Sequence, residues 1–191
     1  MATKITNYSY RYKWIPLLLQ IIYKAHIIEK DLIAIGQLVN ANEASNEEFK
    51  SFLKTKVDAD IDKLVFDLNE AIAPQIDCTA CGNCCKSLLI NVTEEEATTL
   101  ARHLNQSRTN FDAQYLEKSG SMMLMNAIPC TFLTNDTCTV YEHRFAGCRE
   151  FPAMHLPNFN KRLFTTFMHY GRCPIIYNIV EELKVKTGFK F

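Results

Sequence analysis

Cys78-Thr79-Ala80-Cys81-Gly82-Asn83-Cys84-Cys85 is the stretch that decides how this chain is organised. It holds half of the chain's eight cysteines within eight residues. The other four, Cys130, Cys138, Cys148 and Cys173, follow at wider intervals, and the first 77 residues contain none. Every thiol therefore belongs to the C-terminal part of the chain.

Two cysteines separated by two residues place both sulfurs on one side of a tight turn, where they can bind the same ion. This spacing occurs twice, from Cys78 to Cys81 and from Cys81 to Cys84. Gly82 lies inside the second step, where a loop around an ion often needs a positive φ or a close backbone approach. The doublet Cys84-Cys85 is harder to explain with one ion, because neighbouring side chains diverge on a strand or a helix and both sulfurs reach one ion only through an irregular backbone. Either these two sulfurs serve two sites, or one of them is not a ligand.

The composition and the N-terminal stretch favour metal ligation over disulfide bonds. The N-terminal apolar run is interrupted by polar and charged residues and lacks a cleavage site of small residues, so we expect neither a signal peptide nor a membrane span. Thiols of a cytoplasmic protein stay reduced. The 21 basic and 21 acidic residues balance, which gives no reason to expect binding to nucleic acid. We therefore expect a cytoplasmic protein whose candidate metal ligands are Cys78, Cys81, Cys84, Cys85, Cys130, Cys138, Cys148 and Cys173.

The first 76 residues predict two amphipathic helices. Apolar residues recur in steps of four and three from Trp14 to Val39, which indicates a helix with one apolar seam. Ser45 and Glu48 form a capping box for a second helix, which Pro74 ends. The short polar turn between the two predicts an antiparallel hairpin. We expect the seam to pack on the second helix, with a homodimer or another protein partner as the alternative.

The remaining residues predict short strands and helices around the cysteines. The expected elements are a strand at 88–92, a helix at 93–103 with a Thr93/Glu96 capping box, a helix from Ser107 or Thr109 to Gly120, a strand at 121–126, a hairpin at 129–141, a strand or loop at 155–170 and a helix from Pro174. The expected fold class is α+β, mainly helical. An N-terminal helical hairpin (1–76) would pack on a small cysteine-rich metal-binding domain with short strands (77–191).

Four motifs in order carry a resemblance to a known family. They are the cysteine run at 78–85, Pro129-Cys130-Thr131-Phe132-Leu133, the segment from Cys138 to Arg144, and Cys148-Arg149-Glu150-Phe151-Pro152. Together they resemble the YkgJ-type cysteine-cluster family, described as zinc- or iron-chelating, which includes the flagellin lysine N-methylases. The resemblance covers roughly residues 77 to 175. Phe145 stands where the family usually has proline, which affects the local turn and not the thiols.

Thiolate-rich sites suit both zinc and iron-sulfur clusters. We favour a 4Fe-4S cluster, because CxxCxxC followed by a distant Cys-Pro is similar to bacterial ferredoxin spacing and because the resemblance implies it, and we place zinc second. Four thiolates around either group carry about two negative charges, which must be balanced by nearby basic groups. The candidates within four positions of a cysteine are Lys86, Arg144, Arg149 and Arg172. His143 and His155 flank Cys148 and are further candidate ligands.

The cysteine cluster is compatible with two functions. In the first, the chain is a non-enzymatic module in which the metal stabilises the fold or is carried for delivery. The alternative, which the resemblance implies, is a lysine N-methyltransferase that uses S-adenosylmethionine and a cluster. The sequence shows no glycine-rich loop after a strand to receive a nucleoside. We therefore favour the first function and assign no catalytic residue.

Overall fold

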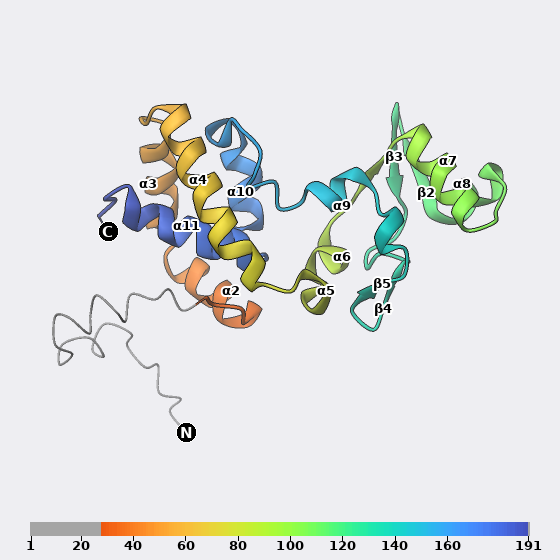
Figure 1. The fold of residues 1–191 in the computed structure, drawn as a ribbon, viewed down its shortest axis with the longest axis horizontal. Coiled ribbons are helices and arrows are strands. Elements are labelled where there is room, and N and C mark those ends of the chain that lie inside the picture. The colour runs from red at the N-terminus through yellow and green to blue at the C-terminus, as the bar shows by residue number, and fades with distance from the viewer. Residues whose placement is uncertain (1–27, 191) are drawn as a thin grey trace, which may run out of the picture.

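The computed structural model describes residues 28–190, in which two groups of elements are joined by the segments that carry most of the cysteines (Figure 1). The first group consists of helices from both ends of this range. The second consists of two helices and a three-stranded sheet. Each group encloses a hydrophobic core, called core 1 and core 2 below. The expected mainly helical fold with small antiparallel sheets is confirmed.

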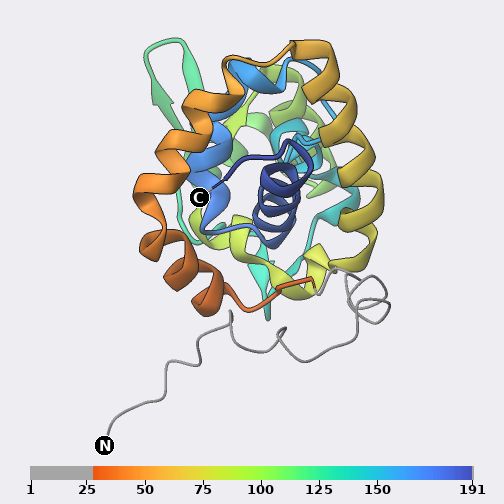
Figure 2. The same ribbon diagram turned by 90° about the vertical axis from the view of Figure 1, so that its left-hand side faces the viewer.

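Core 1 is built around α11 (Pro174–Lys186), the helix predicted to begin at Pro174. Every residue from Pro174 to Val180 is buried. A helix that is buried on most sides needs neighbours on those sides. Figure 2 shows α11 in the middle of this group, with the orange helices to one side and the gold α4 to the other. The surrounding helices are α2 (Leu32–Ala41), α3 (Glu43–Leu53), α4 (Asp58–Ile72) and α10 (Leu163–Tyr170).

The first predicted helix is shorter than expected within the described residues. It begins at Leu32, because the Asp31 carboxylate accepts hydrogen bonds from the N–H groups of Ile33 and Ala34. Ile28, an expected seam residue, therefore precedes the helix. The seam positions from Trp14 to Ala25 lie outside residues 28–190. The proposed dimer through this seam stays a prediction.

The second predicted helix is wrong in its start and its length. The N-cap of α3 is Asn42, so Ser45 lies inside the helix and forms no capping box with Glu48. The helix then breaks, since residues 54–57 separate α3 from α4. The Asn160 amide donates to the Leu53 carbonyl at 3.1 Å and to the Asp58 carboxylate at 2.8 Å, which satisfies groups at the break. The short 3-10 helix η2 (Ala73–Gln75) follows α4.

Core 2 lies between two helices and an antiparallel sheet of strand order β1-β3-β2. The expected strand at 88–92 is present only as β1 (Asn91–Val92), which pairs with β3 (Met122–Met125). The predicted capping box is confirmed, since the Thr93 hydroxyl accepts from Glu96 N–H and the Glu96 carboxylate accepts from Thr93 N–H. It begins α7 (Glu94–His103).

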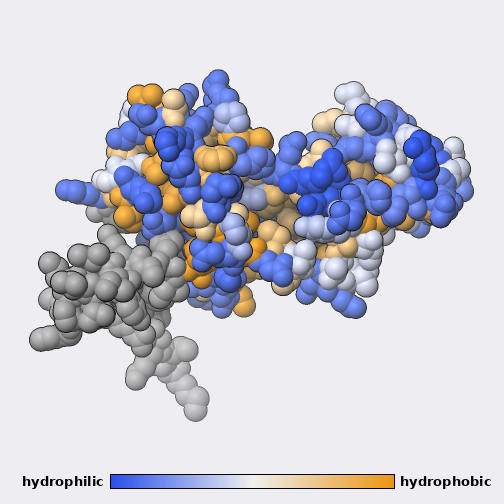
Figure 3. Space-filling model, viewed as in Figure 1, coloured by the Kyte–Doolittle hydropathy of each residue, from blue (hydrophilic) through white to orange (hydrophobic). Residues whose placement is uncertain are grey.

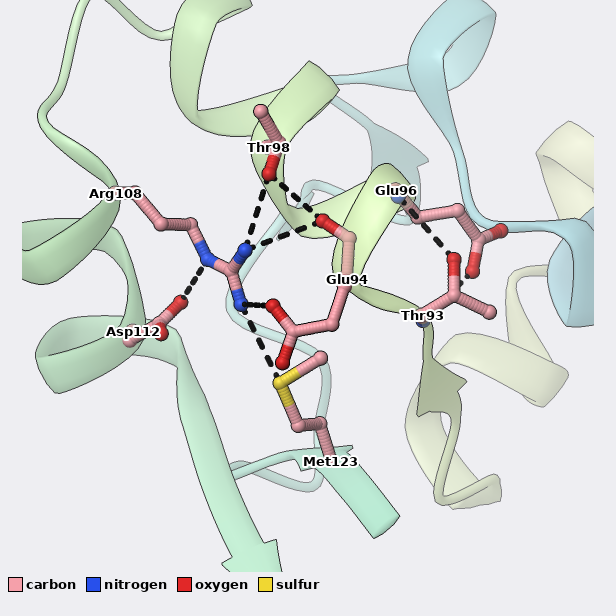
Figure 4. Close-up of polar contacts among 7 residues, drawn as sticks. All are labelled: Thr93, Glu94, Glu96, Thr98, Arg108, Asp112 and Met123. Carbon is pink, nitrogen blue, oxygen red and sulfur yellow. Dashed lines mark hydrogen bonds and ion pairs between the residues drawn. The ribbon is translucent and has the colours of Figure 1, made fainter. Parts of the chain in front are cut away.

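Arg108 contacts residues of several elements around core 2. It is the first residue of α8 (Arg108–Tyr115), which the Ser107 hydroxyl caps. Its guanidinium lies 2.5 Å from the Asp112 carboxylate and 2.6 Å from the Glu94 carboxylate, and it contacts the Met123 sulfur at 3.4 Å (Figure 4). A shared cation thus joins α7, α8 and β3.

The helix predicted to run from Ser107 or Thr109 to Gly120 ends earlier. It ends at Tyr115, and the chain continues as β2 (Leu116–Ser119). Gly120 then turns with a φ of +61°, and β3 returns antiparallel with Ser119 opposite Met122. Gly120 therefore ends a strand rather than a helix, and the predicted strand at 121–126 is confirmed.

Residues 159–170 are helical, within the range 155–170 where a strand or loop was predicted. The 3-10 helix η4 (Phe159–Arg162) runs into α10. Phe159, Leu163 and Tyr170 are buried in core 1. Their spacing of four and seven is helical, but the adjacent aromatic residues obscured it in the sequence.

The surface differs between the two groups of elements. Figure 3 shows hydrophobic residues among hydrophilic ones over the core 1 helices, and a mostly hydrophilic surface over the group around core 2. None of the helices within residues 28–190 is long and apolar enough to cross a membrane. Core 1 combines helices from before and after residue 76, so the division into 1–76 and 77–191 stays a prediction.

Candidate metal centre

The cysteine run folds as two short helices on either side of Gly82. The Asp77 carboxylate accepts from Thr79 N–H at 2.9 Å and begins α5 (Cys78–Cys81), and α6 (Asn83–Ser87) follows. Gly82 has a φ of +57°, and a Cβ there would lie 3.0 Å from the Asp136 carbonyl oxygen. Both reasons given for glycine at this position are confirmed, the positive φ and the close backbone approach.

The predicted hairpin after Pro129 is confirmed. Strands β4 (Leu133–Thr134) and β5 (Thr137–Cys138) pair with Leu133 opposite Cys138, and Asn135 and Asp136 turn with positive φ values. The N–H group of Cys130 donates to the Cys85 carbonyl at 2.8 Å. The hairpin thus brings Cys130 and Cys138 to the end of the cysteine run.

Cys148 lies on α9 (Ala146–Glu150), which ends shortly before Pro152. The Glu96 carboxylate accepts from Ala146 N–H at 2.5 Å, so the capping residue of α7 also fixes the start of α9. Although burial opposes ionisation of Glu96, the hydrogen bonds from Ala146 and Thr93 lower its pKa.

Cys173 is the N-cap residue of α11 and is 8% exposed. The Asn83 side chain donates to the Arg172 carbonyl at 2.7 Å and so joins this segment to the cysteine run across 89 positions. A helix N-terminus is expected to favour the thiolate of such a cysteine. That expectation is wrong for the metal-free state, because burial raises the pKa of Cys173 to about 12 and outweighs the N–H groups of Ile175 and Ile176.

All eight cysteines line one cavity of about 190 Å³. They are free thiols, and the cysteine run, the hairpin, α9 and the start of α11 bring them together. Within residues 28–190, no three side chains of His, Cys, Asp or Glu are close enough in this conformation to hold a metal ion. Ligation therefore requires thiol side chains to turn toward a common point in the cavity.

Protonation of the thiols follows from burial and from neighbouring thiols. Burial raises the pKa of Cys148 to about 12, and Cys85, Cys130 and Cys138 contribute to this rise. A hydrogen bond between the Cys84 and Cys85 thiols lowers the pKa of Cys84 and raises that of Cys85. Since metals bind thiolates, metal binding here must release protons.

The four basic residues predicted beside the thiols differ in position. Arg144, Arg149 and Arg172 line the cavity, whereas Lys86 does not. Lys86 is exposed and forms an ion pair of 2.6 Å with Asp136, at the turn of the hairpin. Arg149 donates to the Arg144 carbonyl.

Arg144 has the most direct relation to the thiols. Its guanidinium carbon lies 3.7 Å from the centre of the Tyr141 ring, just after the short helix η3 (Tyr141–His143). Its Nε is buried without a hydrogen-bond partner. Its charge opposes the rise in pKa of four thiols, those of Cys78, Cys85, Cys138 and Cys148. Arg144 is thus placed to balance thiolate charge.

The histidine that lies beside the thiols is not one of the two predicted candidates. His143 and His155 are exposed and do not line the cavity, and the His143 ring lies tilted against the His103 ring with 3.7 Å between the ring centres. His169 lines the cavity instead, and its Nδ1 is buried without a hydrogen-bond partner. No sequence pattern indicated this, because His169 is in no paired motif and reaches the cavity through the fold of α10.

A protein-family model matches residues 77–173, about half of the chain. The matching model is named CxxCxxCC and described as a candidate zinc- or iron-chelating domain. This chain belongs to the CxxCxxCC family. The match spans all eight cysteines, so the predicted resemblance to a cysteine-cluster family is confirmed. No curated protein and no solved structure matched the chain in the other two comparisons.

The cavity of this CxxCxxCC protein fits the metals that the family description names. Eight thiols around one small cavity form a soft donor set, which zinc and iron-sulfur clusters prefer over the oxygen donors that suit magnesium or calcium. Three arginines line the same cavity and can balance thiolate charge.

Proposed function

We propose that this protein chelates zinc or iron through its cysteine cavity, and that the bound metal stabilises the fold or is carried for delivery. The observation that supports this most is the meeting of all eight thiols at one cavity, although four of them are far apart in the sequence. Cysteines that served only as core residues would not be expected to gather at one cavity. Membership of the CxxCxxCC family agrees with this function.

An iron-sulfur cluster of the 4Fe-4S type is the group that we favour. Cys78, Cys81 and Cys84 have the CxxCxxC spacing, and the distant Cys173 that precedes Pro174 has the Cys-Pro form of a bacterial cluster ligand. The hydrogen bond from Asn83 to Arg172 keeps Cys173 beside this run. Zinc is the second candidate, since four thiolates also suit it.

Charge agrees with a thiolate centre. Four thiolates bound to zinc or to a cluster carry about two negative charges, and that charge costs free energy to bury unless cations or hydrogen-bond donors face it. Arg144, Arg149 and Arg172 supply such cations in the lining of the cavity. Nothing observed in residues 28–190 favours the methyltransferase alternative over chelation.

The test is metal analysis and visible absorption of the full chain purified without oxygen. Iron and labile sulfide with a broad visible absorption band are the result expected for the cluster. Stoichiometric zinc in a colourless protein would overturn the cluster and keep the chelating function. Protein without either metal, even after anaerobic reconstitution with each, would overturn the function itself.

A further inference from the structure

We propose that the eight cysteines form two separate four-thiolate metal sites, an inference that rests on the proposed chelating function. The first thiol set is Cys78, Cys81, Cys84 and Cys173. The second thiol set is Cys85, Cys130, Cys138 and Cys148. The sites would meet at the Cys84-Cys85 doublet.

The first thiol set is joined by contacts to the start of α11. Cys78 and Cys81 lie at the two ends of α5, and Cys84 lies on α6 one residue after Asn83. The Asn83 amide donates to the Arg172 carbonyl at 2.7 Å, which brings the residue before Cys173 to the residue before Cys84. Cys173 itself is part of core 1.

Backbone contacts join three members of the second thiol set, two of them in the hairpin. Cys130 N–H donates to the Cys85 carbonyl at 2.8 Å, and the Cys130 carbonyl accepts from Leu133 N–H at 2.9 Å. Leu133 pairs with Cys138 across the two strands. These contacts connect Cys85, Cys130 and Cys138 in one chain of neighbours.

The hydrophobic cores separate the same two sets. Cys130, Cys138 and Cys148 pack against core 2, whereas Cys173 belongs to core 1. Each set thus has the support of a different core. Each set also takes ligands from the cysteine run, which lies between the two groups of elements (Figure 1).

The doublet is explained by this division. Cys84 and Cys85 are consecutive on α6, and consecutive side chains of an α-helix point about 100° apart. One sulfur can therefore face each set. The hydrogen bond between the two thiols in the metal-free protein would be lost when both become thiolates.

Electrostatic contacts between the thiols follow the same division. The pKa of Cys148 is raised in part by Cys85, Cys130 and Cys138, which are the other three members of its set. In the first set, Cys78 and Cys81 act to raise the pKa of Cys173. Cys78 and Cys173 act in the same direction on the pKa of Cys84. Cys84 and Cys85, at the boundary between the two sets, also interact with each other.

The experiment compares the full chain with Cys78→Ser in the first set and Cys138→Ser in the second. Cys78 is exposed and Cys138 is half-buried, so a serine at either position disturbs little packing. Each protein, loaded with zinc or reconstituted with iron and sulfide, is measured for metal by mass spectrometry under non-denaturing conditions. Cysteine alkylation followed by peptide mapping then identifies the unprotected thiols.

We expect each variant to hold half of the metal of the unaltered protein. Cys78→Ser should expose Cys81, Cys84 and Cys173 to alkylation, and Cys138→Ser should expose Cys85, Cys130 and Cys148. Exposure of both sets by either variant, in protein with an unchanged far-ultraviolet circular dichroism spectrum, would overturn the division. A single metal group held by thiols of both sets would also overturn the division.

A measurement on the unaltered chain tests the division into two sets even if the variants fail to fold. Stepwise removal of metal with a chelator should pass through a half-loaded form in which one complete thiol set remains protected. A half-loaded form that protects thiols from both sets would overturn the division and leave the chelating function intact. Complete absence of bound metal would overturn the chelating function as well.

Discussion

Arg144 lines the cavity, and its charge reaches both thiol sets. It opposes the rise in pKa of Cys78 in the first set, and of Cys85, Cys138 and Cys148 in the second. Its ring contact with Tyr141 fixes the guanidinium, and its Nε lacks a hydrogen-bond partner in the metal-free protein. Two four-thiolate centres would carry about four negative charges in total, so this residue should matter most when metal is bound.

We predict that Arg144→Met lowers metal affinity about tenfold or more, because groups beside metal ligands typically contribute that much. Competition with a chelator of known affinity measures the effect. Arg102→Met is the matched control, since Arg102 is exposed and does not line the cavity. Equal affinity of Arg144→Met and unaltered protein would contradict this role.

The buried thiols also predict how stability depends on pH in the metal-free, reduced protein. Burial raises the pKa of Cys148 and Cys173 from 9.0 to about 12. A raised pKa in the folded state means that the fold favours the protonated thiol. This contribution is complete below pH 9 and is lost as pH rises toward 12. The melting temperature should therefore fall between pH 9 and 11, and the Cys148→Ala/Cys173→Ala variant should show a smaller fall.

At the scale of elements, the contact between the cysteine run and the hairpin depends on Gly82. An alanine there would adopt a left-handed conformation and place its Cβ 3.0 Å from the Asp136 carbonyl oxygen. We predict that Gly82→Ala lowers the free energy of unfolding by about 2 kcal/mol and reduces metal occupancy. Chemical denaturation and metal analysis measure the two effects.

Gly120→Ala is the control for that substitution. Gly120 has a φ of +61°, close to that of Gly82, but a Cβ there has no atom within 4 Å. The Gly120→Ala variant should lose only the free energy of unfolding that the left-handed conformation costs, and it should keep its metal. Equal losses of stability and metal in the two variants would show that the approach to Asp136 has no importance.

Some elements set by adjacent residues were predictable from the sequence, whereas those set by distant contacts were not. Thr93 and Glu96 cap α7, and Asn135-Asp136 turns the hairpin, each through neighbouring backbone groups. The break between α3 and α4 is different, because it is satisfied by Asn160, 107 positions from the Leu53 carbonyl. No local pattern contains that information.

The same distinction applies to the candidate site. Spacing indicated that thiols gather, and their residue type indicated soft metals. Which thiols are neighbours became visible only in the fold, through contacts such as Asn83 with Arg172 and Cys130 with Cys85. His169 reaches the cavity in the same way, from a helix where the sequence predicted a strand or loop.

At the scale of the whole molecule, Lys184 joins helices from both ends of the described chain. It is 1% exposed, and its ammonium lies 2.7 Å from both the Glu181 carboxylate and the Asn46 side-chain oxygen and 3.1 Å from the Tyr170 hydroxyl. The cluster connects α3, α10 and α11 inside core 1, and α11 is the helix that Cys173 precedes.

We predict that Lys184→Met lowers the free energy of unfolding by about 3 kcal/mol, since it leaves the partly buried Glu181 charge without its cation. Chemical denaturation measures this. Lys186→Met is the control on the same helix, where the side chain is exposed, and it should change stability by less than about 0.5 kcal/mol. Similar losses in the two variants would contradict a stabilising role for the buried cluster.

The most direct test of the central claim, that the eight thiols bind metal, is a joint count of bound metal and reactive thiols in the folded full chain. A thiol reagent is added under native conditions, then after a chelator, with metal measured at each step. We predict stoichiometric metal with the cysteines protected, and release of both together. A folded chain that holds no metal and reacts at its cysteines from the start would contradict the claim.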